Sequence, residues 1–198
     1  MARSLAIAAM VAALLGGVLA AWLWSRAGQS ATLPAAAPAP RSLGDLPPAL
    51  INDVKVPVER LQGLPRARVV RAVDGDTVIV QTDGREHRLR LIGVDTPESV
   101  DPRRPVQPYG KAAAAFTSNV LTGRTVYLEL DVEERDQYGR LLAYLYLEDG
   151  TFFNALLLRA GFAHVLTIPP NVKYADLFQE MARRARAESR GLWALPAR

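Results

Sequence analysis

The stretch "RARVVRAVDGDTVIVQTDGREHRLRLIGV", Arg66–Val94, decides the fold of this 198-residue chain. It contains three β-rich runs, and an Asp-Gly pair separates each run from the next. The runs are 66–73, 76–82 and 86–94, and the pairs are Asp74-Gly75 and Asp83-Gly84. Asp-Gly between runs of strand-forming residues is typical of a tight hairpin turn. The stretch therefore predicts a three-stranded antiparallel meander.

The rest of the folded region alternates helix and strand patterns. The expected elements are a helix at 109–123, strands at 125–132 and 140–147, a helix at 154–161 and a last helix at 175–191. Asn154 is a candidate N-cap and Gly161 a helix end, while Leu177, Met181 and Ala185 would form the inward stripe of the last helix. Five strands with a helix after the third predict an α+β fold, a five-stranded Greek-key β-barrel of the oligonucleotide-binding (OB) type with three α-helices.

The N-terminal region has the composition of a membrane segment. Arg3 precedes an uncharged apolar run, Leu5–Trp24, and about 20 such residues are enough to cross a bilayer as a helix. Residues 1–26 are therefore predicted to be a signal-anchor or transmembrane segment, preceding an exported, membrane-anchored domain in the periplasm or outside the cell. Small residues at Ala20, Gly28 and Ser30 also permit cleavage, which would give a secreted protein. A buried globular helix is the remaining alternative.

Residues 27–65 are predicted to be an Ala- and Pro-rich linker and lead-in, and residues 66–194 the folded domain. Proline restricts the backbone and removes amide donors, so Ala27–Pro48 is expected to be an extended tether. The chain has no cysteine, which excludes disulfide bonds and thiol chemistry.

The net charge of +4 is weak evidence about the partner. Three of the 24 basic and one of the 20 acidic side chains lie before residue 49, so the remainder has a net charge of only about +2. This charge permits a nucleic-acid partner without establishing one. The cluster Arg183-Arg184-Arg186 is interpreted as a solvated helix face rather than a nucleic-acid patch.

Charged residues gather at three places where the fold pattern does not require them. The first is Asp74-Gly75-Asp76, the second is Arg90 with Asp95, Thr96 and Glu98, and the third is Arg140 after the Tyr138-Gly139 turn. Asp74 and Asp76 are two residues apart, so in an extended chain they face the same side. A hairpin turn by itself also explains this pair.

Three of these residues suit a metal site. Hard divalent ions such as Ca²⁺ prefer oxygen ligands, which the carboxylates of Asp76 and Asp95 and the carbonyl of Thr96 could supply. His87 and His164 have no partner at ligand spacing and are interpreted as surface or packing residues.

Three others suit a phosphodiester. Arginine donates paired hydrogen bonds to phosphate and stays charged, so Arg90 and Arg140 could hold the phosphate and stabilise the extra charge of its transition state. Glu98 could accept a proton from an attacking water or orient that water. Together, the residues predict a site that combines a metal with a phosphate.

Five motifs in chain order carry a resemblance to a known family. The motifs "DGDTV", "RLIGVDTPES", "YGKAA", "DQYGRLLAY" and "NALLLRAGFAHV" span most of Val69–Trp193, and the set resembles the staphylococcal nuclease (thermonuclease) family. This resemblance implies an OB-type barrel and Ca²⁺-dependent hydrolysis of DNA and RNA with little sequence preference, leaving 3′-phosphate ends. The sequence indicates no protein partner, and we expect a monomer. The resemblance also implies metal ligation by Asp76, Asp95 and Thr96, catalysis by Arg90, Glu98 and Arg140, support of the metal shell by Asp74, and a place beside the nucleotide's phosphate for Tyr138.

Two positions depart from the best-known member of that family. Gln137 replaces a lysine near the nucleotide's terminal phosphate, and around Thr167 that member has a tyrosine that packs on the base. We therefore expect weaker or differently oriented nucleotide binding with catalysis retained. Arg103 and Arg104 are equally well explained by contact with nucleic acid and by a solvated loop.

The alternative function is a catalytically silent OB-type module that binds nucleic acid or a protein, because this fold often serves as a binding module. Such a module should have lost at least one residue of the charged set, and the whole set is present. A structural envelope protein would leave that set without a purpose.

Overall fold

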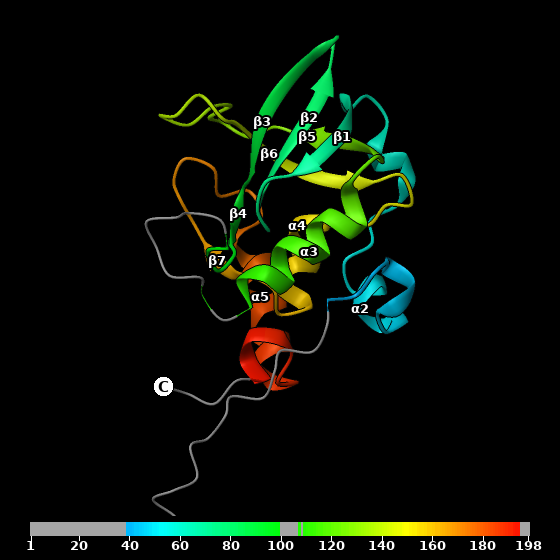
Figure 1. Ribbon diagram of the computed structural model, residues 1–198, viewed down its shortest axis with the longest axis vertical. Helices are drawn as coiled ribbons and strands as arrows, with labels where there is room; N and C mark the ends of the chain where they lie inside the picture. Colours follow the sequence, from blue (N-terminus) through cyan, green and yellow to red (C-terminus); the bar gives the residue numbers. More distant parts are fainter. Residues whose placement is uncertain (1–38, 100–106, 108, 195–198) are drawn as a thin grey trace, which may run out of the picture. The chain divides into compact units, whose positions relative to one another are not determined.

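A computed structural model describes residues 39–99, 107 and 109–194 of the chain (Figure 1). The predicted membrane segment at 1–26 lies outside the described residues, as do Arg103 and Arg104. Within the described ranges, no helix has both the length and the apolar character needed to cross a membrane.

The predicted five-stranded barrel is confirmed. Its strands are β1 (Arg66–Ala72), β2 (Thr77–Thr82), β3 (Arg85–Leu91), β5 (Thr125–Glu129) and β6 (Leu141–Leu147). They close in the order β1-β2-β3-β6-β5, and every neighbouring pair is antiparallel except β3 and β6. The parallel pairing sets Arg90 of β3 opposite Leu142 of β6, so two of the predicted charged stretches meet at this seam.

The three expected helices are present, and shorter elements accompany them. The helices are α3 (Gly110–Leu121), α4 (Phe153–Arg159) and α5 (Ala175–Ala187). The further elements are a short helix, α2 (Pro48–Asn52), and the 3₁₀ turns η1 (Leu43–Asp45), η2 (Val58–Leu61) and η3 (Gly191–Ala194). On α5, Met181 and Ala185 are buried as predicted, but Phe178 lies deeper than Leu177.

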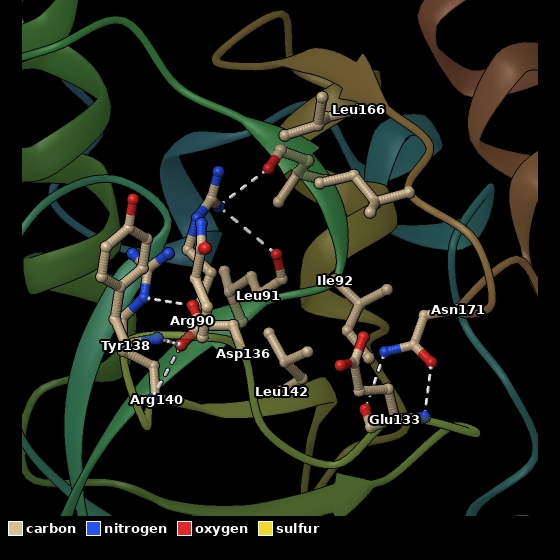
Figure 2. Close-up of a pocket in the computed structure, with 14 residues that line it drawn as sticks. Arg90, Leu91, Ile92, Glu133, Asp136, Tyr138, Arg140, Leu142, Leu166 and Asn171 are labelled. Atoms are coloured by element: carbon tan, nitrogen blue, oxygen red, sulfur yellow. Dashed lines mark hydrogen bonds and ion pairs between the residues drawn. The ribbon is translucent and has the colours of Figure 1, made fainter.

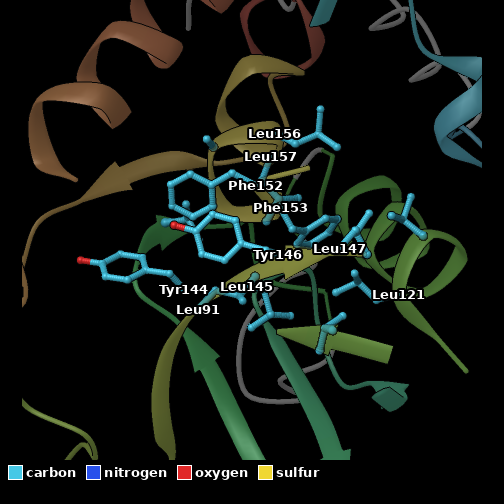
Figure 3. Packing of buried hydrophobic residues seen from close by; sticks show 14 of the residues in the cluster. Leu91, Leu121, Tyr144, Leu145, Tyr146, Leu147, Phe152, Phe153, Leu156 and Leu157 are labelled. Atoms are coloured by element: carbon cyan, nitrogen blue, oxygen red, sulfur yellow. The ribbon is translucent and has the colours of Figure 1, made fainter. Parts of the chain in front are cut away.

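The core fills the space between β6 and α4 (Figure 3). Tyr144, Leu145, Tyr146 and Leu147 follow one another along β6 and are nearly inaccessible, as are the residues of α4 that face them. The two tyrosines bury their rings and keep their hydroxyls at the edge of the core. Tyr144 donates to Asp131 at 2.8 Å and Tyr146 to Glu129 at 2.7 Å. These four residues are therefore buried on both faces of the strand, so they do not show the alternation of buried and exposed residues expected for a half-buried strand.

Part of the predicted linker and lead-in packs against the barrel domain. Leu50, Val54 and Leu61 belong to the hydrophobic core, and the backbone of Val56 donates to Gly150 at 2.9 Å. The extended tether was expected to reach Pro48, but residues 43–48 contain η1 and the start of α2. The prediction is therefore wrong for these residues.

The third predicted strand, 86–94, is in fact two strands. β3 ends at Leu91, and β4 (Gly93–Asp95) pairs with β7 (His164–Leu166) in a separate two-stranded antiparallel sheet. Gly93 has φ +79° in the left-handed region, which redirects the chain between the two strands. A Cβ at Gly93 would overlap the ring of Phe178, so α5 packs directly on this turn. The turn presents Asp95 at the end of β4.

Gly93→Ala is expected to destabilise the protein by about 2–5 kcal/mol. The left-handed backbone costs a non-glycine residue about 1–2 kcal/mol, and displacement of the Phe178 ring adds an overpacking cost of about 1–3 kcal/mol. Urea denaturation measures the change. Gly84→Ala is the matched control, because Gly84 also has a positive φ but open space around it. An equal loss in both variants would contradict the packing argument.

Candidate active site

Arg90 lies at the centre of the site, between two carboxylates. Its Nη1 lies 3.0 Å from Asp76 Oδ2, and its Nη2 lies 3.1 Å from Asp95 Oδ1. Nη1 also donates to the Val94 carbonyl at 2.8 Å. The side chain is 12% exposed, so these contacts operate with little solvent screening. The predicted stretch from Arg90 to Asp95 thus closes on itself around the guanidinium.

Asp76 is fixed on the barrel side of the site. Its Oδ2 accepts hydrogen bonds from the backbone N–H of Thr96 at 2.9 Å and from the Thr96 hydroxyl at 3.0 Å. Its Oδ1 accepts one from the Thr77 hydroxyl at 3.0 Å. Asp76 and Thr96 are both buried, whereas the Asp95 side chain is 55% exposed. One carboxylate is therefore rigid and enclosed, and the other faces solvent.

Asp74 and Glu98 lie close enough to these carboxylates to interact with them electrostatically. Asp74 Oδ1 accepts hydrogen bonds from the Gly75 backbone at 2.8 Å and the Ser99 hydroxyl at 2.6 Å. Burial raises the pKa of Asp74, and the negative charges of Asp76 and Glu98 raise it further. The Glu98 backbone is held on both sides by Gln107, whose Oε1 accepts from its N–H at 3.1 Å and whose N–H donates to its carbonyl at 3.0 Å.

The pKa of Asp95 is also raised, as that of Asp74 is. Partial burial of the carboxyl group raises this pKa, and the positive charge of Arg90 lowers it. The negative charges of Asp76 and Glu98 raise it further. Asp74, Asp76, Asp95 and Glu98 therefore form an acidic cluster that Arg90 only partly compensates. A bound cation would relieve the repulsion among these groups.

The residues predicted as metal ligands fit a hard cation. All three would offer oxygen, and each carboxylate keeps an oxygen that Arg90 does not contact: Asp76 Oδ1 and Asp95 Oδ2. In the described ranges, the hydrogen bonds of Thr96 involve its N–H and its hydroxyl, so its carbonyl oxygen remains for a metal ion. No group of three His, Cys, Asp or Glu side chains suited to a metal was found among the described residues, so carbonyl oxygen and water would have to complete the shell.

Arg140 reaches the site from the turn before β6. Its Nε lies 2.6 Å from Asp136 Oδ2, and its guanidinium lies over the Tyr138 ring, 5.5 Å from the ring centroid. Burial alone would raise the pKa of Asp136, but the hydrogen bonds from Arg140 outweigh it, so the pKa is lowered. Asp136 Oδ1 also accepts from the backbones of Tyr138 and Arg140, which closes the turn.

Both arginines line one pocket of about 400 Å³ (Figure 2). Its apolar wall includes Leu142, Leu166 and Ile168, and Ile168 is 58% exposed at the rim. Cationic groups thus lie beside an aliphatic surface, an arrangement that suits a phosphate attached to a flat organic group. The structure brings Arg90 and Arg140 together as the sequence predicts.

A single amide joins the two loops that wall the pocket. Asn171 accepts a hydrogen bond from the Glu133 N–H and donates one to the Glu133 carbonyl, both at 2.8 Å. This links the segment carrying Ile168 to the segment carrying Asp136, Gln137 and Tyr138. Gln137 lines the pocket. Around Thr167, where the best-known family member has a tyrosine, this chain lines the pocket with the aliphatic side chains of Leu166 and Ile168.

Sequence reasoning missed Asp136 and Asn171. Asp136 lies four residues before Arg140 in "DQYGR", and that spacing across a Gly-containing turn is a usable signal for a carboxylate that orients an arginine. No comparable signal identifies Asn171, because its partner Glu133 is 38 residues away.

Asp136→Asn is expected to lower kcat by about tenfold with a smaller change in KM. The amide keeps an oxygen for the turn but loses the charge that fixes Arg140, and misplacement of a positioned group costs rate rather than ground-state binding. Steady-state cleavage of a DNA oligonucleotide measures both constants. Asp83→Asn, at the exposed β2–β3 turn, is the control. A purely structural role for Asp136 would instead lower stability and leave kcat per folded molecule unchanged.

Comparison with known proteins agrees with this fold. A model of the family described as staphylococcal nuclease homologue matches residues 88–195. The thermonuclease of Staphylococcus intermedius is 49% identical over 125 residues, which cover 63% of this chain and 74% of that protein. The thermonuclease of Staphylococcus hyicus is 45% identical over 127 residues, covering 64% and 75%. Endonuclease YncB of Bacillus subtilis is 39% identical over 126 residues, covering 63% and 59%.

The chain forms an OB-type barrel with two arginines at one pocket. Together with these matches, this places the protein in the class of nucleases, which are hydrolases. The chain belongs to the staphylococcal nuclease family. This membership favours an enzyme over the silent binding module.

Proposed function

We propose that this nuclease hydrolyses phosphodiester bonds of DNA and RNA with little sequence preference, depends on Ca²⁺, and leaves 3′-phosphate ends. The observation that carries the proposal is the position of Arg90, which lines one pocket with Arg140 and contacts the carboxylates of Asp76 and Asp95. Asp76, Asp95 and the Thr96 carbonyl would hold the cation, and Asp74 would support Asp76 from behind. When bound, Ca²⁺ would supply positive charge next to the phosphate and the attacking water.

The two arginines would bind the scissile phosphate from two different elements of the fold. Arg90 and Arg140 donate from β3 and from the turn before β6, and paired N–H groups match the oxygens of a phosphate. Because the phosphate gains negative charge as water attacks, fixed cations in a partly enclosed pocket stabilise the transition state more than the bound substrate. Tyr138, 75% exposed beside Arg140, would lie next to the nucleotide's phosphate.

Glu98 would take the proton from the attacking water. Its backbone is fixed by Gln107, and its charge is felt at both Asp74 and Asp95, so the carboxylate lies within the acidic cluster. A carboxylate there can accept a proton from the water as it attacks. No covalent intermediate with the protein is needed.

Cleavage of DNA and RNA in Ca²⁺ and in EGTA tests the proposal directly. We expect activity on both polymers in Ca²⁺, loss in EGTA, and products with 3′-phosphate ends. Glu98→Gln is expected to lower kcat by about 10²–10⁴-fold, the usual contribution of general base catalysis, whereas Glu148→Gln at an exposed turn should not. Full activity of the chelated wild type would rule out the metal, and full activity of Glu98→Gln would rule out the base.

We also propose that residues 1–26 export and anchor the enzyme, or are cleaved to release it. The basis is the uncharged run Leu5–Trp24 alone. Fractionation of cells that express the full chain tests this: nuclease activity in the cytoplasmic fraction would contradict export.

A further inference from the structure

An arginine face lies on the barrel next to the proposed active site. On β1, β2 and β3, the inward positions are Val69, Val78, Val80 and Leu89, all fully buried. The outward positions include Arg68, Arg71 and Arg88, which are exposed and which we call the arginine face. A register shift between Val69 and Arg71 puts Arg71 on the same side as Arg68.

The strand register connects this face to Arg90. Arg71 of β1 and Arg88 of β3 both pair with Ile79 of β2, so they form one row across three strands. The next row pairs Thr77 with Arg90. Arg88 and Arg90 are two residues apart on the same side of β3, which separates their Cα atoms by roughly 6.6 Å. The arginine face is therefore one row from the proposed phosphate site.

In the part of the chain that the structure describes, the three arginines of this face have no ion-pair partner. Among the described residues, Arg68, Arg71 and Arg88 also make no side-chain hydrogen bond. One acidic side chain lies on the same face: Glu86 is in the row of Arg68 and Gln81, two residues before Arg88. Several arginines elsewhere are paired with carboxylates. On α5, for example, Arg183 and Arg184 both bind Glu180. With three arginines and one glutamate, the face keeps a net positive charge, which attracts a polyanion.

We propose that Arg71 and Arg88, with Arg68 beyond them, bind backbone phosphates of the nucleic-acid strand next to the scissile phosphate. This inference rests on the proposed function, in which Arg90 holds the scissile phosphate. A strand that extends beyond Arg90 along β3 meets Arg88 next, and Arg71 lies in the same row as Arg88. Arginine side chains suit the charged phosphates of the backbone. The face thus extends the binding site beyond the pocket and recognises backbone rather than bases.

A nucleic-acid strand fits this face better than an anionic membrane. Membrane-surface segments combine basic residues with large apolar side chains that enter the bilayer. The only large apolar side chain among the exposed ones on described β1–β3 is Val70, at 37% exposure.

The test compares long and short substrates in the full-length chain. The variant is Arg71→Gln/Arg88→Gln. The control is Lys55→Gln/Arg183→Gln, which removes two exposed positive charges elsewhere. The substrates are a single-stranded DNA of about 20 nucleotides and a dinucleotide, because only the longer strand can reach the arginine face. Binding of the longer DNA is also measured by fluorescence anisotropy in EGTA across a range of salt concentrations.

We expect the variant to lose about tenfold in kcat/KM on the longer DNA at low salt and to keep its activity on the dinucleotide. The slope of log K against log salt should fall in magnitude by about 1.4, since each contact with a single strand contributes about 0.7. The control should change neither value. Equal losses on both substrates, or in variant and control alike, would overturn the proposal.

Two further outcomes are distinguishable. If the wild type cleaves neither substrate, the proposed function fails, while a reduced salt slope in the variant still supports the arginine face. If the variant instead loses binding to phosphatidylserine vesicles, relative to phosphatidylcholine vesicles, and keeps its salt slope on DNA, the face binds membranes and the proposal is wrong.

Discussion

Arg140→Ala is expected to lower kcat by about 10³–10⁵-fold, the range found when an arginine that stabilises a phosphoryl transition state is removed. Two contacts fix this side chain before substrate arrives: the 2.6 Å ion pair with Asp136 and the Tyr138 ring beneath the guanidinium. Because its position is prepared in advance, no reorganisation is needed as charge develops on the phosphate. The effect should therefore fall on kcat.

Three comparisons separate this role from simple charge. Arg140→Lys keeps the positive charge but loses the planar pair of donors, so we expect it to recover only part of the rate. Arg183→Ala removes an exposed arginine from α5 and should leave kcat unchanged. Binding of DNA in EGTA should weaken much less than kcat falls. A raised KM with unchanged kcat would show that Arg140 binds substrate and transition state equally.

The local parts of the site are predictable from the sequence. Arg90, Asp95, Thr96 and Glu98 lie within nine residues, and a strand followed by a turn brings them together whatever surrounds them. Pairing of β3 with β6, which joins Arg90 to Arg140, follows from the barrel and therefore from the fold prediction. Short sequence separation and regular topology explain this success.

The elements that the sequence did not predict are short. β7 contains only His164, Val165 and Leu166, too few residues for alternation to be detected, and it exists because β4 offers it a partner. The break at Gly93 depends on the ring of Phe178, which is 85 residues further along the chain and becomes a neighbour only when α5 packs. Long-range packing determines both features.

Asn154 is the clearest wrong prediction. The expected N-cap role follows from its preference for helix starts. In the structure Asn154 is the second residue of α4, the N-cap position is Phe152, and no side chain caps this helix. The Asn154 side chain instead accepts from the Leu145 N–H at 2.9 Å and donates to the Ile92 carbonyl at 2.8 Å, and it is fully buried. Gly161 does end the helix as predicted, with hydrogen bonds from Gly161 and Phe162 back to its last turn.

Asn154→Leu is expected to destabilise the protein by about 3–5 kcal/mol, although leucine has a similar size and the site is apolar. The substitution leaves two buried backbone groups, the Leu145 N–H and the Ile92 carbonyl, without those hydrogen bonds, and each such loss costs about 1–3 kcal/mol. Urea denaturation measures the change. Asn119→Leu is the control, because Asn119 is exposed and donates only to the Pro40 carbonyl; its cost should stay below about 1 kcal/mol.

The same amide connects stability to the active site. Ile92 is two residues after Arg90 and directly precedes the Gly93 turn, so the hydrogen bond from Asn154 holds α4 against the junction of β3 and β4. Below its unfolding transition, Asn154→Leu should keep most of its kcat per folded molecule, because Arg90 retains its own contacts with Val94, Asp76 and Asp95. A loss of activity far larger than the loss of folded protein would mean that the junction itself positions Arg90. A destabilisation below about 1 kcal/mol would mean that water replaces both bonds of the amide.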